Sequence, residues 1–131
     1  RLSESGAVLE SREFSRGILS VPAGQFESVW HELFGDWMVS EQALCLISGM
    51  AGSRQGWQEA PYCPCPADFA ELGKHLLWLQ PGRLALVPGL CCMADNPTRT
   101  PDVMRGEETK LVALAGRIGA APALAAAGAK A

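Results

Sequence analysis

The chain has 131 residues, of which 48% are hydrophobic and 19% charged, a composition typical of a globular domain long enough to bury a core. Its formal net charge of -3 provides no basic excess, which argues against nucleic acid or an anionic membrane as the main partner. No apolar run approaches the roughly 18 residues that span a bilayer, and the N-terminus lacks a basic region followed by an apolar core. We therefore expect a cytoplasmic protein that acts on a small molecule.

The first half of the chain predicts a strand, a helix and a second strand. Ala7 to Ser15 contains β-compatible side chains without clean alternation and predicts a strand. From Gln25 to Phe34 apolar side chains recur at helical spacing and Gly35 follows as a C-cap, which predicts an amphipathic helix. The continuous apolar segment from Ala43 to Ile47 predicts a strand buried on both faces of a parallel sheet.

The second half continues this alternation. Leucines at helical spacing predict a helix from Asp68 to Leu79, with the carboxylate of Asp68 at its N-terminus. The apolar run from Leu84 to Val87 predicts a strand, and a third helix is expected from Gly106 to Ile118. Strands that alternate with helices predict an α/β fold with a mostly parallel sheet flanked by helices.

The cysteines and histidines give a weaker signal. The odd number of cysteines, without disulfide-scaffold spacing, favours reduced thiols that pack as small buried hydrophobic side chains in a cytosolic protein. A soft metal site that also uses His31 or His75 is the less favoured alternative, because the spacings match no zinc motif. No metal ligand is therefore predicted. The five cysteines are Cys45, Cys63, Cys65, Cys91 and Cys92.

A glycine-rich loop follows the second predicted strand, from Ser48 to Trp57. Its spacing fits neither of the glycine fingerprints for nucleotide phosphates, and it better suits a substrate loop. In such a loop Arg54 can bind a carboxylate and Trp57 can form a flat wall. The alternative is a solvated tight loop in which Trp57 fills the core. The predicted substrate-binding residues of this loop are Ser53, Arg54, Gln55 and Trp57.

A second polar cluster lies between Val103 and Thr109, where Arg105, Glu107 and Glu108 fall at the predicted start of the third helix. Ligands of open α/β sheets bind where strands end and helices begin, so this cluster is a candidate site for chemistry. The alternative is that these charges complement the dipole of an exposed helix start.

Several strings together resemble the 2-dehydro-3-deoxygalactonokinase family. They are Ser48-Gly49-Met50-Ala51-Gly52-Ser53-Arg54-Gln55-Gly56-Trp57, Ala60-Pro61-Tyr62, Val87-Pro88-Gly89-Leu90 and Asp102-Val103-Met104-Arg105-Gly106-Glu107-Glu108-Thr109. The resemblance implies a ribonuclease-H-like lobe of the actin-like ATPase superfamily. It also implies ATP with Mg²⁺, and transfer of the γ-phosphate to the C6 hydroxyl of the sugar acid 2-dehydro-3-deoxygalactonate.

The resemblance also implies roles for individual residues. Glu107 would be the general base or would orient the nucleophile, and Arg105 would counter the charge of phosphate or substrate. Glu108 would support the substrate side of the site. Arg54 would bind the carboxylate of the sugar acid.

The resemblance covers the N-terminal half of that family, without its Asp-Trp-Gly-Thr-Thr-Asn phosphate loop or its C-terminal lobe. We therefore expect residues 1–119 to form a partial N-terminal lobe and residues 120–131 to form an alanine-rich tail. The isolated chain is expected to be inactive and to self-associate through its incomplete sheet. The alternative is a noncatalytic α/β binding or assembly module.

Overall fold

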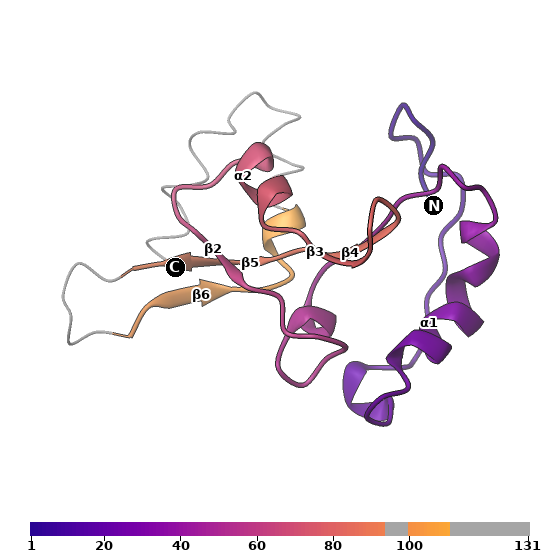
Figure 1. Ribbon diagram of the computed structural model, residues 1–131, viewed down its shortest axis with the longest axis horizontal. Helices are drawn as coiled ribbons and strands as arrows, with labels where there is room; N and C mark the ends of the chain where they lie inside the picture. The colour runs from indigo at the N-terminus through magenta and orange to yellow at the C-terminus, as the bar shows by residue number, and fades with distance from the viewer. Residues whose placement is uncertain (94–99, 111–131) are drawn as a thin grey trace.

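The structure, a computed structural model, describes residues 1–93 and 100–110. In these residues the fold is mixed α/β, with two three-stranded sheets and few helices (Figure 1). None of the helices described has the length and apolar character that a membrane span requires. The strands are β1 (Cys45–Ile47), β2 (Tyr62–Pro64), β3 (Leu77–Gln80), β4 (Leu84–Leu86), β5 (Gly89–Cys92) and β6 (Asp102–Met104). The α-helices are α1 (Phe26–Phe34) and α2 (Phe69–Lys74), and short 3-10 helices span Ile18–Ser20, Gly35–Met38 and Met50–Gly52.

Each sheet combines one parallel and one antiparallel pair of strands. In the first sheet β4 lies between the parallel β1 and the antiparallel β3; in the second, β5 lies between the parallel β2 and the antiparallel β6. The prediction of a mostly parallel sheet is therefore wrong for the described residues. The turn from β3 to β4 contains Gly82 with a φ of 71°, and a connection this short joins antiparallel neighbours.

Strand β4 is the most buried strand of the first sheet. Leu84, Ala85 and Leu86 each have 0% of their surface exposed, as expected for an apolar strand between two neighbours. The predicted strand from Leu84 to Val87 is confirmed, and the N–H of Val87 donates to the carbonyl of Ile47 at 2.8 Å. Figure 1 shows β4 running on into β5, so one stretch of chain links the two sheets.

The predicted strand from Ala43 to Ile47 is confirmed as β1, parallel to β4. Its predicted burial on both faces is wrong, because the Leu46 side chain is 51% exposed. Within the described residues β1 is an edge strand, with one strand neighbour. The apolar run therefore predicted the strand correctly but not its position at the edge of the sheet.

The predicted helix from Gln25 to Phe34 is confirmed as α1, and Gly35 closes it by donating its N–H to the carbonyl of His31. The buried Trp30 packs against Trp57 from the glycine-rich loop, with the ring centroids 6.1 Å apart. This contact connects the helix to the candidate site.

The predicted helix from Asp68 to Leu79 is too long. Helix α2 begins after Asp68, whose side chain accepts the N–H of Glu71 at 2.9 Å, and it ends at Lys74. Strand β3 then begins at Leu77 and pairs with β4. Pairing with a buried strand satisfies the backbone and overrides the helical spacing of the leucines.

The predicted strand from Ala7 to Ser15 is absent; the only strand-like pairing described near it is a single bridge between Leu2 and Val8. Instead this segment runs beside α1 (Figure 1). Arg12 donates to the carbonyl of Leu33 at 2.8 Å and forms an ion pair with Asp36 at 2.6 Å. The Arg12 side chain therefore fastens this segment to the end of α1, while the backbone N–H groups of Leu9 and Glu10 donate to the carbonyl of Arg1.

The predicted helix from Gly106 to Ile118 begins at Glu108 and is described as far as Lys110. The remainder of that prediction and the alanine-rich tail of residues 120–131 lie outside the described residues. Strand β6, which was not predicted, ends at Met104 and is joined to the helix by the turn at residues 105–107.

Candidate functional site

The two polar segments singled out in the sequence meet in the structure through their glycines. Gly49 and Gly106 both have positive φ values, of 91° and 106°, a region that L side chains rarely adopt. A Cβ atom on Gly106 would lie 3.0 Å from the Cα of Gly49. The backbone of the glycine-rich loop therefore packs against the turn that follows β6, and a side chain at Gly106 would separate them.

We call the contact between the glycine-rich loop, at Gly49, and the turn after β6, at residues 105–108, the junction. Arg105 stabilises it. Its Nη2 donates to the carbonyl of Ala60 at 2.9 Å, and its guanidinium carbon lies 4.3 Å from the ring centroid of Tyr62. A Cβ atom on Gly52 would lie 3.0 Å from Nη1, so glycine leaves room for the arginine. Nε and Nη1 are buried and have no hydrogen-bond partner among residues 1–93 and 100–110. Arg105 thus joins three segments, and two of its guanidinium nitrogens have no hydrogen-bond partner within the described structure.

The neighbouring carboxylates have opposite environments. Glu107 is exposed, whereas Glu108 is fully buried, with 0% exposure. Oε2 of Glu108 accepts the backbone N–H of Gly106, and its Oε1 has no partner in the part of the chain that the structure describes. Glu108 therefore holds the turn after β6, and Glu107 is the carboxylate free to meet a ligand.

Internal hydrogen bonds shape the glycine-rich loop. The hydroxyl of Ser53 donates to the carbonyl of Met50 at 2.7 Å and accepts the N–H of Gln55 at 3.3 Å. The N–H of Trp57 donates to the carbonyl of Ala51 at 2.7 Å. Ser53 is thus engaged in holding the loop, while the side chains that follow it are presented outward.

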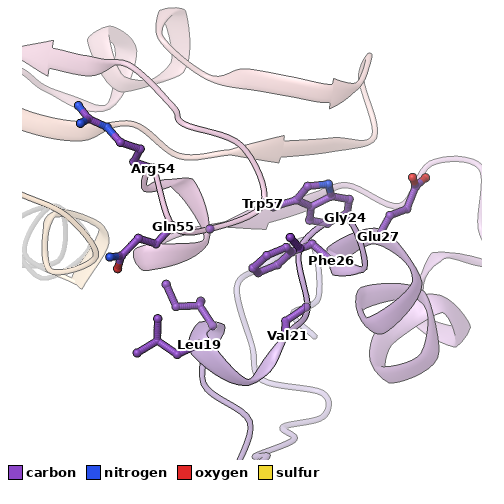
Figure 2. A pocket seen from close by; sticks show the side chains of 11 residues that line it. Leu19, Val21, Gly24, Phe26, Glu27, Arg54, Gln55 and Trp57 are labelled. Atoms are coloured by element: carbon purple, nitrogen blue, oxygen red, sulfur yellow. The ribbon is translucent and has the colours of Figure 1, made fainter.

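Those side chains line a cavity of about 430 Å³ (Figure 2). Arg54, Gln55 and Trp57 form one wall, and the other is formed by the segment between the first 3-10 helix and the start of α1. The side chain of Arg54 is 87% exposed, and its ion pair with Glu59 is long, at 3.7 Å. The residues of the second wall are Ile18, Leu19, Val21, Ala23, Gly24, Phe26 and Glu27.

The predicted site residues therefore form two groups. Arg54, Gln55 and Trp57 line the cavity, whereas Arg105, Glu107 and Glu108 belong to the junction and are not among its lining residues. The second cavity wall was not predicted, because the segment before α1 has no periodic pattern. The contact of Tyr62 with Arg105 was not predicted either; the available signal was an aromatic residue a few positions after the predicted substrate loop.

All five cysteines are free thiols, and burial raises the pKa values of Cys45, Cys63 and Cys65. Across residues 1–93 and 100–110, no group of three or more histidine, cysteine or acidic side chains is placed to hold a metal ion.

A family model described as 2-keto-3-deoxy-galactonokinase matches residues 1–128. The chain belongs to this family. It is 36% identical over 121 residues to a probable 2-dehydro-3-deoxygalactonokinase of Rhizobium meliloti, covering 91% of this chain and 39% of that relative. It is also 36% identical over 104 residues to the 2-dehydro-3-deoxygalactonokinase of Escherichia coli, covering 79% of this chain and 34% of that protein.

A solved structure agrees with these family members. The chain superposes with a TM-score of 0.73 and 34% identity on the crystal structure of a Sinorhizobium meliloti protein provisionally named 2-dehydro-3-deoxygalactonokinase. The match covers 89% of this chain and 38% of that one. The chain thus spans between a third and two fifths of the length of these relatives.

Proposed function

We propose that this chain is the substrate-binding part of an enzyme that transfers the γ-phosphate of ATP to the C6 hydroxyl of 2-dehydro-3-deoxygalactonate. The family membership supports this reaction, since the matched relatives carry that kinase name. The observation that carries the proposal is the cavity beside the glycine-rich loop, because the family string supplies one of its walls.

In this proposal the carboxylate end of the sugar acid occupies the cavity, and its C6 end lies towards the turn at Gly106, which packs against the glycine-rich loop at Gly49. The cavity volume of about 430 Å³ falls within the range of about 300–1,000 Å³ typical of small-molecule sites. Arg54 binds the carboxylate of the sugar acid, because its guanidinium is exposed and its only ion pair within the described residues is long. Gln55 binds a hydroxyl, and Trp57 with Phe26 forms an apolar wall; all three side chains are among those that line the cavity in Figure 2.

The chemistry is assigned to the junction. Glu107 accepts the proton of the C6 hydroxyl while the C6 oxygen forms its bond to the γ-phosphorus and the bond to the leaving ADP oxygen breaks. The positive charge of Arg105, close to the turn that carries Glu107, favours the negative charge that develops on the transferring phosphoryl group. Glu108 acts indirectly, by holding the turn that presents Glu107.

We further propose that the two sheets belong to a ribonuclease-H-like lobe and that ATP binds with Mg²⁺. The superposition with the Sinorhizobium meliloti structure supports a shared fold. Mg²⁺ is usually held by phosphates and one or two carboxylates. The described residues contain no group of three or more histidine, cysteine or acidic side chains that could hold the ion.

The test uses a completed protein, in which this chain is joined to the remaining segments of the Escherichia coli relative. We expect this protein to convert ATP and 2-dehydro-3-deoxygalactonate to ADP and the C6 phosphate, and the 131-residue chain alone to show no turnover. Both are assayed by ADP release and by mass spectrometry of the sugar product. A folded completed protein that releases no ADP with this sugar acid would contradict the proposal.

A noncatalytic binding or assembly module is the second candidate. Leu44, Leu46 and Trp78 expose large apolar surfaces on or beside the first sheet, and such surfaces favour self-association. Light scattering of the purified chain tests this candidate. Association that rises with concentration, combined with no turnover by the completed protein, would favour the module over the kinase.

A further inference from the structure

Four of the five cysteines belong to the second sheet and its continuation, on strands that are parallel neighbours. In the register of β2 and β5, Cys63 lies opposite Leu90 and Pro64 lies opposite Cys91. The N–H of Cys65 continues the ladder by donating to the carbonyl of Cys91 at 2.9 Å. In a parallel ladder this bond places Cys65 opposite Cys92.

Only one pair among these four cysteines suits a cross-strand bond. Successive side chains of a strand point to opposite faces, so Cys91 lies on the other face from Cys92. Cys63 shares the face of Cys65, but it is 1% exposed and packs against Leu72 and Leu90. Cys65 and Cys92 are partly exposed, and they share both a face and a register position.

The spacing of this pair also suits a disulfide. Neighbouring strands lie about 4.8 Å apart, and the Cα atoms of disulfides are usually separated by about 4.4–6.8 Å. The pKa of Cys65 is raised to about 12, first by burial and then by the neighbouring Cys92 thiol, which agrees with two thiols in close proximity.

We propose that Cys65 and Cys92 are a redox-active dithiol that small-molecule disulfides oxidise to a bond between β2 and β5. Because the raised pKa of Cys65 keeps that thiol protonated, the thiolate of Cys92 attacks the disulfide of oxidised glutathione, forms a mixed disulfide and releases one glutathione thiolate, which takes up a proton. The second cysteine loses its proton to solvent and displaces the other glutathione. In sum two protein thiols become one disulfide, while glutathione disulfide is reduced to two glutathione molecules.

The Cys65–Cys92 pair lies in the same region of the fold as Arg105, but neither thiol takes part in the proposed kinase reaction. The bond would cross-link β5 to the end of the strand that begins with Tyr62, whose ring lies against Arg105. Oxidation would thus restrict the movement of β2, the strand whose Tyr62 packs against Arg105.

The experiment maps the bond in the purified 131-residue chain. The reduced chain is incubated with oxidised glutathione at mildly alkaline pH, quenched with acid, alkylated and digested with trypsin. Cleavage after Arg54, Lys74 and Arg83 separates the β2 cysteines from the β5 cysteines. We expect one predominant cross-linked peptide pair, lighter than its two reduced peptides by two hydrogen atoms.

Serine variants assign the bond to individual thiols. Cys65→Ser and Cys92→Ser should abolish the link, whereas Cys63→Ser and Cys91→Ser should retain it. Cys45→Ser, in the other sheet, is the matched control. Far-ultraviolet circular dichroism verifies that each variant folds like the parent. Glutathione adducts without a link in the folded parent, or a link that survives in folded Cys65→Ser or Cys92→Ser, would overturn the proposal.

Discussion

Arg54 and Arg105 come from neighbouring parts of the candidate site, but their surroundings differ. Arg54 lies on the cavity wall, with its side chain 87% exposed and a single long ion pair within the described residues. Arg105 lies at the junction, hydrogen-bonded to Ala60 and stacked on Tyr62. An exposed guanidinium can exchange its partner for a ligand at little cost, whereas a packed one also supports the fold. The same residue type is therefore expected to bind substrate at one position and to organise the site at the other.

The largest effect, on kcat, is expected at Glu107, the exposed carboxylate in the turn that contains Arg105. Glu107→Gln in the completed protein retains the size of the side chain but removes the base, so kcat should fall by about 10²-fold or more with little change in KM. Steady-state assays of ADP release measure both constants. Glu107→Asp is the control, because it retains a carboxylate and should recover part of the rate. Near-normal turnover of Glu107→Gln would remove this residue from the chemistry.

Arg105→Ala should lower the free energy of unfolding of the chain by about 2–3 kcal/mol, because it removes a charged hydrogen bond and a cation–π contact. Urea denaturation followed by tryptophan fluorescence measures the change. Arg105→Lys is the matched variant: it retains the charge but cannot reproduce the planar stacking on Tyr62, and it should recover only part of the loss. An unchanged urea midpoint in Arg105→Ala would show that the junction does not need this side chain.

Arg54→Ala should leave the urea midpoint of the chain unchanged and weaken binding of 2-dehydro-3-deoxygalactonate. The expected loss is about 1.5–3 kcal/mol, the usual contribution of a charged hydrogen bond. Isothermal titration calorimetry of the completed protein measures it. Lys74→Ala, another exposed cation, is the control and should bind normally. Equal affinities for Arg54→Ala and the parent would place the carboxylate elsewhere.

The smallest effect is expected at Arg12, an arginine that serves the fold alone. Its bonds to Asp36 lower the pKa of that carboxylate, so the pair stabilises the chain at neutral pH. This stabilisation is lost as the pH falls below about 4, through the lowered pKa of Asp36. The difference in urea midpoint between the parent and Asp36→Asn should therefore shrink in acid. A difference that stays constant between neutral and acidic pH would contradict this role.

The sequence predicted those elements whose own apolar pattern is sufficient to define them. The apolar face of α1 and the continuous apolar run of β4 were both predicted with nearly correct bounds. The residues of β3 were assigned to a helix, since their leucine spacing also fits a helical face and only pairing with β4 decides between the two. The short strands β2, β5 and β6 have no distinctive pattern, because partner strands rather than their own residues define them.

For the candidate site, the sequence predicted which segments contribute residues but not how those residues are arranged. The family strings identified the glycine-rich loop and the turn around Arg105, but spacing could not show that Glu108 is buried while Glu107 is exposed. Nor could it show the cavity wall before α1, because the residues that form it are adjacent to the loop only in space.

The backbone contact between Gly49 and Gly106 has a consequence for how the chain folds. The two residues are 57 positions apart in the sequence (106 minus 49), so their contact forms only after a long loop has closed. Closing such a loop costs chain entropy that no local hydrogen bond repays, and contacts of this kind slow folding. Helix α1 can form from local contacts, whereas the junction that carries Arg105 and Glu107 must await the closure of β1 through β6. The candidate catalytic centre is therefore expected to be among the last parts of this structure to assemble.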